Sequence, residues 1–147
     1  MGRTIMMIVA LGMVTLSPMM SSAQENGISA DFSGMIETVF NNGQVEMTCD
    51  YVNGMRDGYF ILYHENGVLK EEGEYSNGQK DGEWTRFNDE GKRLAIAHYV
   101  SGSKSGNWKI WDDNGILRYD MSYQDNQKVK IWYMYDEDSQ LVSTKTY

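Results

Sequence analysis

The chain has 147 residues and a net charge of −8, and 12% of its residues are aromatic. The surplus of acidic residues argues against binding to nucleic acid or to anionic membrane surfaces, because both need clustered lysine and arginine to neutralise phosphates. The aromatic content is too high for a disordered acidic chain, and the length fits one folded domain.

Residues 1–23 carry the three parts of a secretory signal peptide. Arg3 gives a positive start, residues 5–16 form an apolar stretch, and the small residues Ser21 and Ala23 suit cleavage after Ala23. This stretch is shorter than the roughly 20 apolar residues that cross a bilayer, so an uncleaved anchor is the less favoured alternative. We predict an exported protein, periplasmic or extracellular, with a mature domain of residues 24–147.

The mature chain repeats every 24 residues. A tyrosine opens each unit, a glycine follows after seven residues, and aromatic rings follow after nine and twelve. A second glycine lies at position sixteen of the unit. The columns contain Tyr51, Tyr75, Tyr99, Tyr123 and Tyr147; Gly58, Gly82 and Gly106; Phe60, Trp84, Trp108 and Trp132; and Gly43, Gly67, Gly91 and Gly115. A fixed period of this length indicates a stacked array of similar units.

Each unit has two turn signals separated by strand-forming residues. Asn53-Gly54 marks one turn and Asn66-Gly67 the other, because Asn and Gly adopt positive φ at little cost. Residues 59–63 and their equivalents are rich in aromatic and β-branched side chains, which favour strands. A lone hairpin is marginal in water, so the hairpins must stack. The sequence therefore predicts an all-β, elongated single sheet of about five stacked hairpins, with roughly ten strands.

The first and last units depart from the pattern. The first, residues 27–50, lacks the opening tyrosine, and its Phe40 lies one place off the aromatic column. The last has Lys130 and Ser139 where the other units have turn glycines. Terminal units of stacked arrays face solvent and are usually atypical, so we expect these two to cap the sheet.

Few residues outside the columns could carry chemistry. Cys49 is the only cysteine, and we expect a buried apolar side chain rather than a reactive thiol. His64 and His98 fall in different columns, which disfavours a shared metal site. Ser101 and Lys104 have the spacing of an acylating serine and its lysine base, but they lie in a segment that reads as a turn in every unit.

The acidic clusters at residues 112–113 and 136–138 suggest calcium binding or a glycosidase carboxylate pair as sharper alternatives. The spacing of an EF-hand is missing, and acids at turn tips are normally solvated. We therefore predict no catalytic residue, no metal site and no cofactor.

The aromatic columns remain the best candidates for a binding surface. Alternation along a strand puts the rings at positions nine and twelve of the unit on opposite faces. We expect the tryptophans at position nine to pack as core. We expect the rings at position twelve to form a partly exposed binding stripe, since rigid rings with polar tips are favoured anchors. The members of this aromatic stripe are Tyr63, Phe87, Trp111 and Tyr135.

The repeated unit, clearest from Tyr51 to Trp84 and continuing to Tyr123, resembles the MORN repeat in its bacterial variant form, as in YwqK-like proteins. The resemblance covers residues 34–147, although the tight Gly-x-Gly step of the common MORN pattern is missing. It implies an interaction module that contacts proteins or lipids, and YwqK-like proteins are often labelled antitoxins.

Together these observations predict an exported, non-catalytic protein-binding or scaffold module. The acidic surface favours a protein partner that is basic, with no nucleic acid and no membrane contact. Two alternatives are an immunity-type antitoxin in the periplasm and a carbohydrate-binding protein. The sequence leaves the oligomeric state open.

Overall fold

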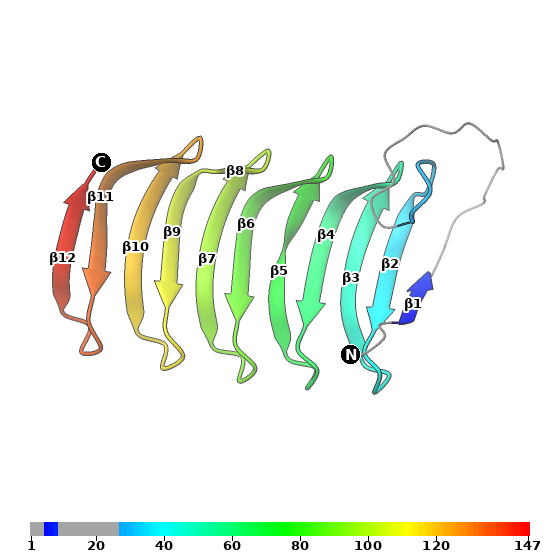
Figure 1. Ribbon diagram of the computed structural model, residues 1–147, viewed down its shortest axis with the longest axis horizontal. Helices are drawn as coiled ribbons and strands as arrows, with labels where there is room; N and C mark the ends of the chain where they lie inside the picture. The colour runs from blue at the N-terminus through cyan, green and yellow to red at the C-terminus, as the bar shows by residue number, and fades with distance from the viewer. Residues whose placement is uncertain (1–4, 9–26) are drawn as a thin grey trace.

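The computed structural model describes residues 5–8 and 27–147, and these form one antiparallel sheet of twelve strands. Consecutive strands lie side by side along the length of the molecule, which is elongated (Figure 1). Of the predicted signal peptide, residues 5–8 form strand β1 beside β2. The rest of that segment and the predicted cleavage site lie outside the described residues.

Five successive hairpins supply ten of the strands, and β1 (Ile5–Ile8) and β8 (Ser103–Lys104) are short additions. The hairpin strands are β2 (Gly34–Val39), β3 (Val45–Val52), β4 (Met55–Tyr63), β5 (Leu69–Ser76), β6 (Gln79–Phe87), β7 (Arg93–Val100), β9 (Gly106–Trp111), β10 (Leu117–Gln124), β11 (Gln127–Tyr135) and β12 (Leu141–Thr146). The prediction of an all-β single sheet of stacked hairpins is confirmed.

The turns that join one hairpin to the next have positive φ at both central residues, as type I′ turns require. Asn53 has φ 50° and Gly54 has φ 75°. The last of these turns contains no glycine, yet Asp125 (φ 48°) and Asn126 (φ 66°) adopt the same geometry. The short side chains of Asn and Asp tolerate this region, so the turn type survives the loss of glycine.

These I′ turns are hydrogen-bonded from one unit to the next. The backbone N–H of Gly54 donates to the carbonyl of Phe32 at 2.8 Å, and that of Gly78 donates to Arg56 at 2.8 Å. The side chain of Asp57 accepts from the backbone N–H of Asn77 at 3.1 Å. Each hairpin is therefore bonded to its predecessor beyond the strand ladder.

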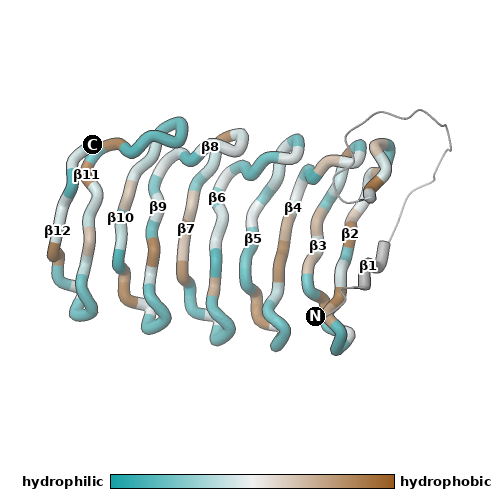
Figure 2. The backbone as a smooth tube through the Cα atoms, viewed as in Figure 1, coloured by the Kyte–Doolittle hydropathy of each residue, from teal (hydrophilic) through white to brown (hydrophobic). Residues whose placement is uncertain are grey.

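The turns within the hairpins are stabilised by hydrogen bonds to the side chain of their first residue. The Asp112 carboxylate accepts the backbone N–H groups of Asn114 and Ile116, each at 3.0 Å. Asn88 and Asp136 do the same in their own units. Figure 2 shows that this row of turn tips is hydrophilic. The acidic side chains at these turns thus have a structural role.

The two positions that lose a turn glycine keep the glycine conformation. Lys130 has φ 63° and Ser139 has φ 60°, both in the left-handed region. The departures of the last unit are therefore changes of residue and not changes of fold. Side chains rarely adopt this region, so each position carries local strain.

The core lies on one face of the sheet. Its buried members are Ile36, Cys49, Tyr51, Phe60, Trp84 and Ala97. Small residues lie beside the large rings: Gly73 pairs with Phe60, and Ala97 pairs with Trp84. Cys49 is fully buried, and burial raises the pKa of its thiol from 9.0 to about 11. The prediction that Cys49 is a buried apolar residue is confirmed.

Among residues 5–8 and 27–147, the structure has no helix long and apolar enough to cross a membrane.

Candidate functional site

The four residues of the aromatic stripe end strands β4, β6, β9 and β11 and lie in equivalent positions of successive units. Each pairs with the residue that begins the next strand, and a register shift precedes each pair. All four are half-buried. Their partners are Leu69, Arg93, Leu117 and Leu141. The stripe therefore has the predicted position and is partly exposed, and its role in binding remains a prediction.

The aromatic stripe shares its face with carboxylates, and we call this side of the sheet the stripe face. Tyr63 borders a shallow depression of about 490 Å³ together with Glu37 and Thr48. A second depression of about 340 Å³ is lined by Tyr59, Glu72, Glu74 and Glu83, among others. Tyr59 is 67% exposed. The stripe face thus combines accessible phenol rings with negative charge.

The opposite face carries a ladder of rings that pack edge to face or at a tilt. Tyrosines that open the units alternate with the rings at position nine, and the contacting pairs have ring centroids about 5 to 6 Å apart. The distances are 5.6 Å for Phe60–Tyr75, 4.9 Å for Tyr75–Trp84, 5.1 Å for Tyr99–Trp108, 5.2 Å for Trp108–Tyr123, 5.0 Å for Tyr123–Trp132 and 4.8 Å for Trp132–Tyr147. Between Trp84 and Tyr99 the link is Lys80, which lies over both rings. We call this side the ladder face.

Each tryptophan in the ladder is also fixed by its indole N–H. Trp84 donates to the carbonyl of Glu74 at 3.1 Å, and Trp108 donates to that of His98 at 3.0 Å. Trp132 donates to that of Ser122 at 3.0 Å. Because this donor is satisfied in each of these units, the ring orientation repeats along the sheet.

A column of cations runs along the ladder and was missed by the sequence reasoning. Each cation follows the opening tyrosine by five residues and lies over two rings, one from its own unit and one from the next. The distances to the ring centroids are 5.9 and 5.2 Å for Arg56 (Phe60, Tyr75), 3.6 and 5.6 Å for Lys80 (Trp84, Tyr99), 4.9 and 5.3 Å for Lys104 (Trp108, Tyr123), and 4.5 and 5.0 Å for Lys128 (Trp132, Tyr147). We call these four residues the cation row.

The signal for the cation row was present in the sequence. The four residues keep the 24-residue step, and the equivalent position of the first unit is Phe32. Phe32 packs against Tyr51 at 6.2 Å, where later units place a cation against the ring of the next unit. A search of the columns for charge as well as for rings would have found this row.

The two histidines occupy separate structural positions. Nε2 of His64 lies 3.0 Å from the carbonyl oxygen of Phe87. Nδ1 of His98 lies 2.8 Å from the carbonyl oxygen of Asn107, and its Nε2 lies 3.2 Å from Glu83. Within residues 5–8 and 27–147, His, Cys, Asp and Glu side chains form no group that could hold a metal ion.

Ser101 and Lys104 belong to a turn and to the cation row. Ser101 has φ 46° and lies at the first central position of a type I′ turn. Its backbone N–H donates to Asp81 at 2.9 Å. The Lys104 ammonium lies over the Trp108 ring, at 4.9 Å from the centroid. The structure thus gives both residues positions that recur in the other units.

Three segments of the chain match the MORN repeat variant family model: residues 56–77, 80–101 and 104–125. Each match begins at a member of the cation row, and the three keep the 24-residue step of the sheet. The chain therefore contains three MORN repeat variants, flanked by the two atypical units. MORN repeats are in general protein- or membrane-binding modules. No curated protein matches the chain.

Proposed function

We propose that these MORN repeat variants form an exported, non-catalytic scaffold whose stripe face binds a basic protein partner. The observation that carries the proposal is the placing of half-buried rings beside carboxylates on one continuous sheet face. Interfaces favour aromatic anchors within a polar rim, and complementary charge steers the partner to the surface.

The carboxylates of the stripe face are available to a partner. Five ion pairs form within the described residues, and they involve Glu71, Glu83, Glu90, Asp112 and Asp120. Glu37, Glu72 and Glu74 belong to none of them. Lysine and arginine side chains of a partner could therefore pair with these three without breaking an existing contact.

The test is a pull-down with matched variants on the two faces. We expect the double substitution Phe87→Ala and Trp111→Ala to abolish recovery of the partner, because it removes two central rings of the aromatic stripe. Tyr119, which is 39% exposed, lies on the ladder face, and Tyr119→Ala should leave recovery unchanged. If the original protein and the two variants are all folded and recover the partner equally, the stripe face is not the docking surface.

The charge of the partner is tested separately. The double substitution Glu72→Gln and Glu74→Gln keeps the shape of the depression and removes two charges. We expect weaker binding and a smaller dependence on ionic strength, because fewer charge pairs are then screened by salt. If the salt dependence of binding is unchanged in this variant, the partner does not bind these carboxylates.

Export is the second part of the proposal. The sequence motif predicts cleavage after Ala23, so mass spectrometry of the protein recovered from the periplasm or medium should give Gln24 as the first residue. An N-terminus that retains residues 1–23, in protein found only in the cytoplasm, would contradict export.

We further propose kinship with YwqK-like proteins and an immunity role as the second candidate. The acidic stripe face favours it, since such a face suits a basic toxin. Co-expression with a neighbouring gene should then be toxic without this protein and tolerated with its exported form. Absence of rescue would count against the immunity role and leave the scaffold role open.

A further inference from the structure

The cation row recurs along the sheet, once in each hairpin after the first. Arg56, Lys80 and Lys128 lie at the start of β4, β6 and β11, and Lys104 lies in β8, just before β9. Successive members are therefore separated by two strands of the sheet. Neighbouring strands lie about 4.8 Å apart, which gives a step of about 9.6 Å between charges. The row therefore presents four positive charges over roughly 29 Å.

The rings hold these cations in place without using all their donors. The quadrupole of a ring attracts a cation to its face, and an ammonium so placed keeps N–H groups for other acceptors. Within the described residues, Lys80 pairs with Glu71 at 2.8 Å, and the other three members of the row belong to no ion pair. In a chain of net charge −8, three of the four cations of the row thus have no ion-pair partner within the described residues.

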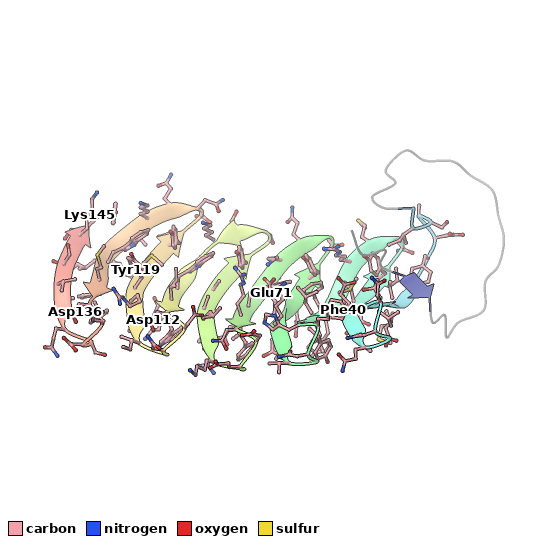
Figure 3. All side chains as sticks on the ribbon, turned by 60° about the horizontal axis from the view of Figure 1, so that its bottom comes forward. Phe40, Glu71, Asp112, Tyr119, Asp136 and Lys145 are labelled. Atoms are coloured by element: carbon pink, nitrogen blue, oxygen red, sulfur yellow. The ribbon has the colours of Figure 1, made fainter. Side chains whose placement is uncertain are left out.

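The acidic turn tips within the hairpins, at residues 112–113 and 136–138, lie away from the row. Figure 3 shows Lys145, which lies over the last ring of the ladder, at one long edge of the sheet, and shows Asp112 and Asp136 toward the other. Charges separated by more than a Debye length, about 8 Å at physiological salt, barely influence each other at the surface. These distant turn tips therefore contribute little to the field at the row. The acids nearest to the row are Glu71, which pairs with Lys80, and Asp57 and Asp81, whose carboxylates accept backbone N–H groups of the I′ turns.

We propose that the ladder face binds an extended acidic peptide in the polyproline II conformation. This helix has three residues per turn and a rise of about 3.1 Å per residue, so every third side chain recurs on one side at about 9.3 Å. That step is close to the spacing of the cation row. Polyproline II segments also dock on surfaces lined with aromatic rings, and the ladder face presents half-buried rings at Tyr99, Trp108 and Tyr123.

The depth of Arg56 and Lys80 favours a chain over a flat membrane. Lys80 has only 29% of its side chain exposed, and Arg56 donates to the hydroxyls of Tyr51 and Tyr75 at 3.2 and 3.1 Å. A carboxylate on a narrow peptide can reach charges recessed among rings. A bilayer surface attracts lysines that extend toward it.

The probe is a 15-residue peptide in which Glu-Pro-Pro is repeated, titrated against the exported protein by tryptophan fluorescence and calorimetry. We expect saturable binding that weakens as salt is raised. A peptide that repeats Glu-Pro-Pro-Pro has the same chemistry but the wrong step, and should bind at least about tenfold more weakly because few charges can pair at once. Equal binding of the two peptides would overturn the proposal.

Matched variants separate the cation row from the rest of the surface. Lys104→Gln and Lys128→Gln should each lower the affinity for the Glu-Pro-Pro peptide by about three- to tenfold. Lys104→Arg should restore binding, because arginine keeps both the charge and the ring contact. Lys109→Gln, on the stripe face beside Asp120, should have no effect. Lys128 is exposed, so its substitution tests the row even if the half-buried Lys104 proves necessary for folding.

Two further outcomes bear on the inference. Vesicles with anionic lipid, or a polyuronate chain, that bind more tightly than the peptide and lose affinity in Lys128→Gln would overturn the peptide as ligand. Normal peptide binding by the Phe87→Ala and Trp111→Ala protein would support the inference and show that it is independent of the proposed stripe-face partner.

Discussion

The middle of the sheet and its C-terminal end use the same ring column but bury it differently. Trp84 is 2% exposed, and its neighbours across the strands are small, with Gly73 close beneath the ring and Ala97 paired opposite. Trp132, from the last unit, is half-buried and pairs with Lys145. All residues of β12 are exposed.

The difference shows what decides burial in this repeat. The position two residues before each opening tyrosine is small in the first three units and large in the last two, with the members Cys49, Gly73, Ala97, Met121 and Lys145. A small residue lets a ring settle against the backbone, whereas a long one holds it away. The ring column sets the architecture, and this second column sets how tightly each unit is packed.

The largest expected effect comes from removing the buried ring. Trp84→Ala should lower the free energy of unfolding by about 3 to 5 kcal/mol, while Trp132→Ala should cost about half as much because its ring is half-exposed. Urea denaturation followed by circular dichroism measures both. Equal costs would mean that the two units are packed alike.

The contact between Gly73 and Trp84 is the next point to test. A Cβ at Gly73 would lie 2.3 Å from the indole ring, so Gly73→Ala must displace the tryptophan. We expect a loss of about 1 to 3 kcal/mol in thermal or urea unfolding. Ala97→Gly, on the other side of the same ring, adds no atom and should cost only about 1 kcal/mol. A neutral Gly73→Ala would show that the ring has room to move.

Alkaline pH should weaken the packed region first. Burial raises the pKa of Cys49 from 9.0 to about 11, and burial also raises the pKa of Tyr75 and Tyr99. The folded state therefore holds these protons more tightly than the unfolded state, and stability is lost as pH rises from about 9 toward 11. We expect the melting temperature to fall by roughly 5 °C over this window. Cys49→Ala should reduce this fall in melting temperature. If the melting temperature of that variant falls as much as that of the original protein, the tyrosines cause the fall.

The smallest effect should come from relieving strain in the last unit. Lys130 has φ 63°, so Lys130→Gly should raise the free energy of unfolding by about 0.5 to 1 kcal/mol. The reverse change at the equivalent position, Gly106→Ala, should destabilise by a similar amount, since Gly106 has φ 67°. Differential scanning calorimetry of the two variants gives the comparison. Two changes of the same sign would contradict a shared left-handed requirement.

The sheet could be predicted because its signals are local and repeated. Asn-Gly pairs, glycines at fixed steps and alternating rings each constrain the backbone nearby, and the period extends the prediction to units such as the last, where Lys130 and Ser139 replace glycine. Strand alternation also placed the aromatic stripe on the face opposite the rings at position nine of the unit.

The cation row could not be predicted with the same ease. Lys80 lies next to a turn, where a lysine is normally a solvated charge. The second ring that it contacts, Tyr99, comes 19 residues later, so the local sequence does not show the contact. The aromatic stripe was expected to be partly exposed, and its four rings are half-buried. The cross-strand partner of each ring could not be predicted, because a register shift precedes the pair, as between Tyr63 and Leu69.

The turn-to-turn hydrogen bonds have a consequence for how such a protein can change in size. Gly78 bonds to Arg56 and Gly102 bonds to Lys80, so each hairpin is tied only to its immediate neighbours. After duplication or loss of one whole 24-residue segment, every remaining turn-to-turn hydrogen bond would still have an equivalent partner. Gene lineages could therefore lengthen or shorten this protein in steps of one hairpin, with the reach of both faces growing or shrinking in proportion.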